Sequence, residues 1–185
     1  MENNPTFPRL QLGISSCLLG QSVRYDGSHK RDAYICDVLQ QHADFFPLCP
    51  EMQIGLGAPR PPIQWINIDG HVRVRAVNKP DGDFTDALNG VADAQLASLQ
   101  TLDGFIVKSR SPSCGLSDAP IHQADQHSSS YRAGAFTERL RILLPQLPII
   151  DEQQLSDARL REDFIASAYR YARRRRLRHV DFDTD

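Results

Sequence analysis

The sequence predicts an α/β fold: a single three-layer, Rossmann-like domain with a mostly parallel sheet, a small hairpin insertion and a C-terminal helix. Short apolar runs alternate along the chain with segments of helical spacing, which is typical of strands connected by helices. Clusters of Gly, Pro, Ser and Asp separate these segments. The chain has 185 residues, of which 41% are hydrophobic, and is therefore long enough to bury one substantial core.

The first fifty residues are expected to contribute two strands and one helix. The apolar run LQLGISSC (10–17) ends in small residues and predicts the first strand. A polar loop is expected at 20–29. Residues 30–44 place apolar side chains on one helical face and predict a helix. The run DFFPLCP (44–50) predicts the second strand, which Pro50 ends.

The middle of the chain is expected to hold a long loop, a hairpin and a helix. Residues 51–63 are rich in Gly, Ala and Pro, so we expect an ordered loop of a length that is often functional. Residues 64–77 alternate apolar and polar side chains around Asp69-Gly70, which predicts a hairpin. Residues 83–101 have apolar side chains at helical spacing.

The last part of the chain repeats the alternation of strand and helix. GFIVKSR (104–110) predicts the third strand, and a Ser, His and Gln-rich loop follows at 117–133. Residues 134–144 predict a helix, and 147–150 a fourth strand. One or two helices are expected over 152–178.

Composition limits the classes of function. The net charge is −2 and the pI about 6.3, so the chain lacks the global basic field of nucleic-acid binders. No apolar run is long enough to span a membrane, and the N-terminus lacks the apolar core of a secretory signal. We therefore expect no membrane partner and a cytoplasmic location. We also expect a domain at 1–150 and a helical extension, packed on it, at 151–185.

The four cysteines fall into two groups. Cys17, Cys49 and Cys114 each lie at or shortly after the end of a predicted strand. The carboxyl ends of parallel strands meet at one edge of a sheet, so these three side chains are expected to converge. Cys36 lies in a predicted helix and is interpreted as a structural thiol. Disulfides are not expected in a reducing compartment.

Several interpretations of the three cysteines are open. A small core residue is the simplest reading of any one of them, but the flanking SSC, CPE and SPSCG supply groups that a core does not need. Structural zinc sites favour close cysteine pairs, which this sequence lacks. The six residues between Cys17 and Arg24 do not fit a cysteine-dependent phosphatase loop. Three thiolates also suit an iron–sulfur cluster with one open iron, although spacing alone indicates this weakly.

At these residues the chain resembles the thiouracil desulfurase (TudS) family, formerly a family of unknown function. The matching stretches are GISSCLLGQSVRYDGSHK (13–30), CPEMQIGLGAPRPPI (49–63) and GFIVKSRSPSCG (104–115), with a weaker match at GAFTERL (134–140). The resemblance implies a [4Fe-4S] cluster held by three cysteines, with one open iron that binds the substrate's sulfur. It also implies non-redox conversion of 2- or 4-thiouracil to uracil and sulfide. The implied cluster ligands are Cys17, Cys49 and Cys114.

The resemblance implies catalytic roles for Glu51 and Ser111. In the hypothesis that follows, Glu51 takes a proton from the attacking water, and Ser111 relays a proton or binds the pyrimidine. The structural alternatives are that Glu51 caps a turn and that Ser111 belongs to a turn before Pro112. Further candidates for substrate binding are Ser16, Asp26, Lys108 and Ser113.

Two rival functions are open. Related enzymes act on 4-thiouridine in tRNA through an additional C-terminal domain, which is not expected here, so a free thiolated nucleobase is the expected substrate. The arginine run Arg173–Arg176 either contacts RNA phosphates or complements the C-terminus of a helix. The other rival is a non-catalytic iron–sulfur or sulfide-carrier module.

Overall fold

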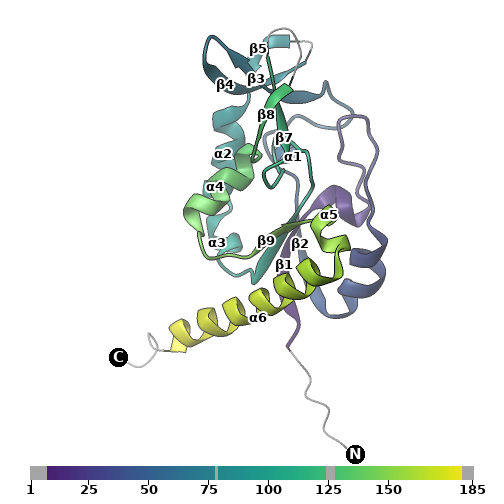
Figure 1. Cartoon of the computed structure of the whole chain (residues 1–185), viewed down its shortest axis with the longest axis vertical. Helices are drawn as coiled ribbons and strands as arrows, with labels where there is room; N and C mark the ends of the chain where they lie inside the picture. The colour runs from purple at the N-terminus through teal and green to yellow at the C-terminus, as the bar shows by residue number, and fades with distance from the viewer. Residues whose placement is uncertain (1–7, 78, 124–127, 181–185) are drawn as a thin grey trace, which may run out of the picture.

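The computed structural model of the chain describes residues 8–77, 79–123 and 128–180. It confirms the α/β fold class, because a parallel sheet carries helices on both faces (Figure 1). This sheet, sheet A, has the strand order β2-β1-β6-β9. Its strands are β1 (Leu10–Ser15), β2 (Ala43–Leu48), β6 (Gly104–Val107) and β9 (Ile149–Asp151).

Helical segments cover both faces of sheet A and give the predicted three layers. Phe105 and Val107 of β6 pack on one face against Phe136 and Leu140, which belong to a helix above that face. The segments over this face are α2 (Thr85–Ala94), α3 (Leu96–Leu99) and α4 (Ala135–Leu143). Those over the opposite face are α5 (Glu152–Ser156), α6 (Ala158–Val180) and two short helical turns, η2 (Tyr34–Val38) and η3 (Leu39–Gln41).

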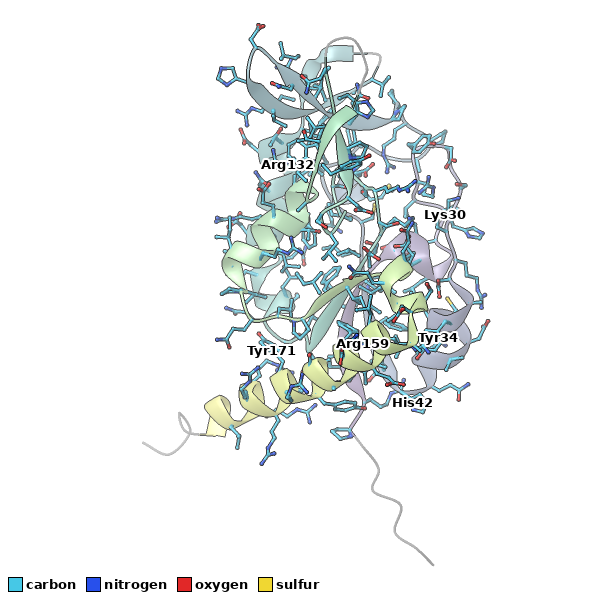
Figure 2. All side chains as sticks on the ribbon, viewed as in Figure 1. Lys30, Tyr34, His42, Arg132, Arg159 and Tyr171 are labelled. Carbon is cyan, nitrogen blue, oxygen red and sulfur yellow. The ribbon has the colours of Figure 1, made fainter. Side chains whose placement is uncertain are left out.

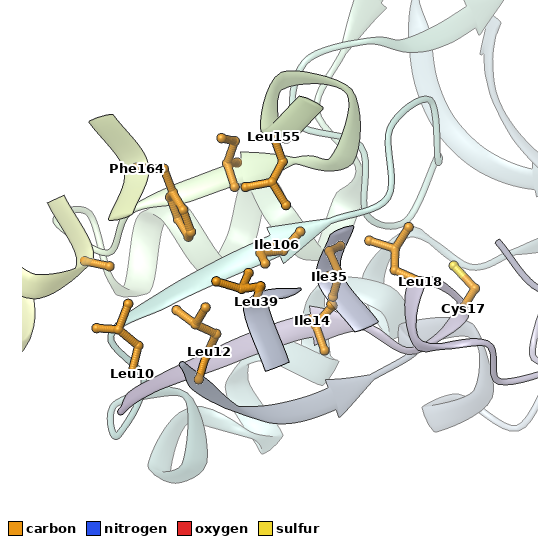
Figure 3. Close-up of a cluster of buried hydrophobic side chains, with 13 residues drawn as sticks. Leu10, Leu12, Ile14, Cys17, Leu18, Ile35, Leu39, Ile106, Leu155 and Phe164 are labelled. Carbon is orange, nitrogen blue, oxygen red and sulfur yellow. The ribbon is translucent and has the colours of Figure 1, made fainter. Parts of the chain in front are cut away.

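The core on this opposite face begins along β1, as Figure 3 shows. Leu10, Leu12 and Ile14 alternate with residues that face the other way, so all three join one buried cluster with Phe164 of α6. Cys17 lies at the end of this cluster, beyond the last residue of β1. The strand that builds the core therefore also delivers a cysteine to the carboxyl edge of the sheet.

The predicted hairpin is confirmed as β3 (Ile63–Ile68) and β4 (His71–Ala76). Asp69 and Gly70 join the two strands with φ values of 51° and 83°. A type I′ turn requires positive φ at both central residues, which Asp-Gly supplies. The hairpin belongs to a second, mixed sheet, sheet B, with the strand order β5-β4-β3-β7-β8.

The expectation of a loop over 117–133 is wrong where sheet B is completed. The segment contains β7 (Ala119–His122), parallel to β3, and β8 (Ser128–Arg132), antiparallel to β7. Both strands are short and rich in Ser, His and Pro, so they carry no apolar alternation. Their pairing with β3 overrides this weak local preference. Residues 124–127 lie outside the described residues.

The helix expected over 30–44 is shorter and irregular: η2 is a π-helical turn and η3 a 3₁₀ turn, together they cover 34–41, and β2 begins at Ala43. The backbone N–H groups of Lys30 and Asp32 donate to carbonyls of the 3₁₀ turn η1 (Ser16–Leu19), each over 2.9 Å. Tertiary hydrogen bonds therefore hold the start of the segment against the turn after β1 in an irregular conformation, and helical structure begins only at Tyr34.

Two smaller differences concern helix boundaries. The segment expected to be a loop, 51–63, begins within α1 (Pro50–Gln53), whose first position suits proline. The helix expected over 83–101 is divided into α2 and α3, and Asp83 instead ends the edge strand β5 (Lys79–Asp83).

The C-terminal helix α6 is fixed to sheet A through several side chains. Phe164 and Ala168 are buried in the core, and Arg175 donates to the fully buried Asp103 over 2.8 Å. The guanidinium of Arg161 lies 4.7 Å from the ring of Tyr34, which Figure 2 shows beside α6. The division into units at 1–150 and 151–185 stays a prediction. In the described part of the chain, no helix combines the length and apolar character of a membrane span.

Candidate active site at the carboxyl edge of the parallel sheet

The structure brings Cys17, Cys49 and Cys114 to the wall of one pocket. They follow β1, β2 and β6, whose carboxyl ends lie along the same edge of sheet A. The pocket has an empty volume of about 400 Å³, including its mouth. Its wall also contains five polar residues of interest, Ser16, Glu51, Lys108, Ser111 and Ser113. Cys36 is not part of this wall.

The pKa values of all three thiols are raised in the folded protein. Burial, followed by the neighbouring Cys49, raises the pKa of Cys17 to about 11. Burial is also the largest cause that raises the pKa of Cys49 and of Cys114. Cys49 also raises the pKa of both other thiols, so it lies close to each of them. A metal centre that bound here would displace their protons.

The N-terminus of α4 holds the loop that carries Cys114. The backbone N–H of Phe136 donates to the carbonyl of Ser113 over 3.0 Å, and the Thr137 hydroxyl donates to the carbonyl of Cys114 over 2.7 Å. Gly134 permits this approach. A Cβ at that position would lie 2.4 Å from the backbone nitrogen of Cys114. The position of Cys114 therefore depends on close backbone packing against α4.

We expect Gly134→Ala to destabilise the fold by about 1–3 kcal/mol, because the methyl group would meet backbone atoms that cannot rotate away. Gly90→Ala is the matched control, since a Cβ at Gly90 in α2 has no neighbour within 4 Å. That change should leave the free energy of unfolding unchanged or raise it by up to about 1 kcal/mol. Chemical denaturation of both variants measures the difference, and equal stability would contradict the close packing.

Glu51 is held by an arginine and a serine on its two carboxylate oxygens. Arg60 donates from Nε to Glu51 Oε2 over 2.8 Å and from a terminal nitrogen to the same oxygen over 2.5 Å. The Ser113 hydroxyl donates to Glu51 Oε1 over 2.7 Å. Glu51 makes no cap at the start of α1. The side chain of Arg60 is 4% exposed, so this ion pair is buried.

Ser111 contacts Ser113 through its hydroxyl group. The Ser111 hydroxyl accepts from the backbone N–H groups of Ser113 and Cys114, over 3.3 and 3.1 Å. Its oxygen is 3.0 Å from the Ser113 hydroxyl oxygen. Since the Ser113 proton is directed to Glu51, the Ser111 proton is free to point to Ser113. The hydroxyls thus form a directed chain from Ser111 through Ser113 to Glu51.

Lys108 is tied to a carboxylate that the sequence did not reveal as a site residue. Its Nζ donates to Glu152 Oε1 over 2.5 Å and to the Ser109 hydroxyl over 2.9 Å. The backbone N–H of Ser109 donates to the other Glu152 oxygen over 2.8 Å. Burial alone would raise the pKa of Glu152, but these hydrogen bonds from Lys108 and Ser109 outweigh burial and lower it. The network joins the end of β6 to the start of α5.

We expect Glu152→Gln to lower the free energy of unfolding by about 3–5 kcal/mol at neutral pH, because it leaves Lys108 buried without its anionic partner. The folded state lowers the pKa of Glu152, so this stabilisation is complete above the ordinary value of 4.5 and is lost as pH falls through the folded pKa. The difference between variant and wild type should therefore narrow below pH 4.5 in acid titrations followed by denaturation. Glu138→Gln, at an ion pair with a 46% exposed carboxylate, is the control and should cost less than about 1 kcal/mol. A difference in the free energy of unfolding between Glu152→Gln and wild type that stays constant down to low pH would contradict stabilisation by the Glu152 carboxylate.

Of the other residues predicted to bind substrate, Ser16 lies in the pocket wall and Asp26 does not. Ser16 is buried in the pocket wall. Asp26 is exposed and absent from that wall, and its carboxylate instead accepts from the backbone N–H and hydroxyl of Ser28 over 3.0 and 2.6 Å. Its neighbours Arg24 and Tyr25 do line the pocket, and neither is among the site residues predicted from the sequence.

The donor set of the pocket fits an iron–sulfur cluster. Three soft thiol ligands share a pocket wall with the cations Arg24, Arg60 and Lys108, which offset the negative charge of thiolates. Among the described residues, no group of three or more His, Cys, Asp or Glu side chains is arranged around a single ion position. In a cluster each thiolate binds a different iron, so the three sulfurs need not meet at one point.

Comparisons with known proteins agree with this arrangement. The model of the 2-thiouracil desulfurase family matches residues 12–152. The uncharacterized protein YbbK of Bacillus subtilis (strain 168) is 31% identical over 108 residues, which cover 55% of this chain and 71% of that protein. A solved structure of the [4Fe-4S]-dependent thiouracil desulfidase TudS is similar, with a TM-score of 0.64 and 28% sequence identity over 84% of this chain and 99% of that one.

Proposed function

Because the chain belongs to the 2-thiouracil desulfurase family, we propose that it removes sulfur from a thiolated pyrimidine. The substrate is 2- or 4-thiouracil, which reacts with water to give uracil and hydrogen sulfide. Water supplies the oxygen of the new C=O bond, the C=S bond breaks, and both protons leave with the sulfur, so no electrons are exchanged. The observation that carries the proposal is the convergence of three cysteines on a pocket that also holds Glu51.

The residues proposed to hold the cofactor, a [4Fe-4S] cluster, are Cys17, Cys49 and Cys114. The similar solved protein is [4Fe-4S]-dependent, which supports this assignment. When bound by three cysteines, such a cluster supplies an iron without a protein ligand, a Lewis acid suited to the soft sulfur of a thiocarbonyl. Cys17 and Cys114 are buried, and electrostatic interactions are stronger beside buried groups than in water.

Glu51 is proposed to act as the general base. Its carboxylate lines the pocket beside the cysteines and can accept the proton of a water that attacks the thiocarbonyl carbon. Arg60 positions this carboxylate, since both of its contacts go to Oε2 and leave Oε1 to the Ser113 hydroxyl. The proton-accepting oxygen is therefore Oε1, on the side of the serines.

Ser113 and Ser111 are proposed to orient Glu51 Oε1, the oxygen that holds the proton. The hydroxyl chain from Ser111 through Ser113 ends on Glu51, with oxygen distances of 3.0 and 2.7 Å. The proton that Glu51 receives at Oε1 can then be donated to the departing sulfur, which restores the carboxylate. Ser113, which the sequence reading assigned to substrate binding, is thereby the direct partner of the base, and Ser111 acts through it.

Turnover of free bases by the anaerobically reconstituted protein tests the proposal. Both 2- and 4-thiouracil should be converted to uracil, and protein without its cluster should be inactive. A cluster-loaded protein that releases no uracil would instead support the carrier-module alternative. Thiolated tRNA belongs in the same experiment as a second substrate, because Arg173, Arg174 and Arg176 of α6 are exposed. Activity on tRNA alone would contradict the assignment to free bases.

A further inference from the structure

The pocket wall contains three cations, and their hydrogen-bonding capacities differ. We propose that Arg24 recognises the substrate by donating a hydrogen bond to the oxygen that a thiouracil keeps, O4 of 2-thiouracil or O2 of 4-thiouracil. The inference rests on the proposed function and specifies how that site selects its substrate. It follows from the partners of Arg24, Arg60 and Lys108, all of which line the pocket.

Two of the three cations, Lys108 and Arg60, already donate hydrogen bonds to acceptors within the protein. Lys108 has three N–H donors and three acceptors, on Ser109 and Glu152. Arg60 donates to Glu51 from two nitrogens, and from the third to the backbone carbonyls of Val23 and Gly57. Their side chains are 17% and 4% exposed. Lys108 therefore has no donor to spare, and every nitrogen of Arg60 already donates within the protein.

Arg24 differs from both. Its Nε is buried and has no hydrogen-bond partner. Its ion pair with Asp26 is long, 3.8 Å, and the Asp26 oxygen concerned already accepts two hydrogen bonds from Ser28. A buried guanidinium donor without an acceptor is unfavourable. No described residue accepts a hydrogen bond from the two terminal nitrogens of Arg24 either, so their N–H groups are available to an acceptor on a ligand in the pocket, and the exocyclic oxygen of a thiouracil supplies one.

The loop that carries Arg24 is linked to the residue that holds the base. Arg60 donates from its side chain to the carbonyl of Val23 over 2.9 Å and from its backbone N–H to the carbonyl of Tyr25 over 2.8 Å. Arg24 lies between these two contacts, so its position is fixed relative to Glu51. A substrate held by Arg24 would therefore be held in register with the base.

Tyr25 supplies an aromatic surface beside Arg24 that suits the planar ring of a pyrimidine. The Arg24 guanidinium lies 5.4 Å from the centre of the Tyr25 ring, and Tyr25 is 42% exposed at the pocket. An aromatic ring paired with a guanidinium provides flat surfaces against which a pyrimidine can stack. The recognised ligand is thus a planar heterocycle with a thiocarbonyl and a second exocyclic acceptor.

Substrates with and without the second exocyclic oxygen test the inference. Kinetics of the loaded enzyme are measured with 2-thiouracil and with pyrimidine-2-thione, which lacks O4. Arg24→Met should lower kcat/KM for 2-thiouracil about 10- to 100-fold, the effect of losing one charged hydrogen bond, and should change pyrimidine-2-thione little. Calorimetric binding of uracil to the loaded enzyme should weaken by the same factor. Arg31→Met is the control, because Arg31 is 44% exposed, pairs with Asp37 and is absent from the pocket wall.

Arg24→Lys separates recognition from a purely electrostatic role, since it keeps the charge and loses the planar guanidinium. It should keep the cluster but recover only part of the preference for 2-thiouracil. An equal loss on both substrates, or loss of iron from Arg24→Met that Arg24→Lys restores, would overturn the proposal in favour of a cluster-stabilising charge. If the wild type desulfurates neither substrate while Arg24→Met still weakens uracil binding, the proposed function fails and the recognition site stands.

Discussion

Replacing Glu51 by glutamine is expected to lower the rate of desulfuration about 10²- to 10⁴-fold while the cluster remains bound, because an amide cannot accept the proton of the attacking water. Iron content and the absorbance spectrum should match the wild type, since Glu51 is not one of the proposed cysteine ligands. The measurement is kcat for 2-thiouracil under anaerobic conditions, with iron and sulfide determined on the same sample.

A second variant separates this catalytic effect from a loss of stability. Glu51→Gln leaves Arg60, which is 4% exposed, without its anionic partner, so the fold should lose about 3–5 kcal/mol. Combining Glu51→Gln with Arg60→Met removes both charges and should recover much of that stability, but no activity. An active double variant, or a single variant with more than a tenth of the wild-type rate, would contradict a general base at Glu51.

Serine substitution of each proposed cluster ligand is expected to abolish activity altogether. Cys17→Ser, Cys49→Ser and Cys114→Ser each remove one soft thiolate, so a [4Fe-4S] cluster should not be retained. Wild-type protein should bind about four iron and four acid-labile sulfide per chain after anaerobic reconstitution. Cys36→Ser is the matched control and should retain full iron and activity, because Cys36 lies outside the pocket wall. Full iron content in any of the three ligand variants would remove that cysteine from the ligand set.

The parts of the fold that the sequence predicts well are those with strong local signals. The strands that became β1 and β2 are apolar runs with clear ends, and Asp69-Gly70 defines the hairpin turn. The rule that parallel strands share a carboxyl edge was enough to group Cys17, Cys49 and Cys114 and to separate Cys36. These predictions depend on periodicity and topology, which a single sequence displays.

The contacts around the site could not be predicted, because they join residues with no shared local pattern. Glu152 lies 43 residues from the serine that its carboxylate binds, and nothing in the helix that starts there marks it. Arg60 sits in a loop whose course depends on several glycines and prolines, so its pairing with Glu51 had no periodic signal. Arg24 was considered for its spacing from Cys17, which does not fit a phosphatase loop, and this spacing gives no sign that Arg24 lies in the pocket wall.

The differences in secondary structure have the same origin. Residues 30–44 have a helical pattern, but backbone hydrogen bonds to the turn after β1 take priority. Strands β7 and β8 lack an apolar alternation and form because β3 offers them a partner. In both cases tertiary hydrogen bonds outweigh the local preference of the segment.

The most direct test of non-redox, hydrolytic desulfuration is the conversion of 2-thiouracil in H₂¹⁸O, with cluster-loaded protein and no electron donor. Uracil and sulfide should form in equal amounts over many turnovers, and each uracil should carry one ¹⁸O atom from the solvent. Uracil without the label, or product that forms only when a reductant is added, would contradict the attack of water on the thiocarbonyl carbon.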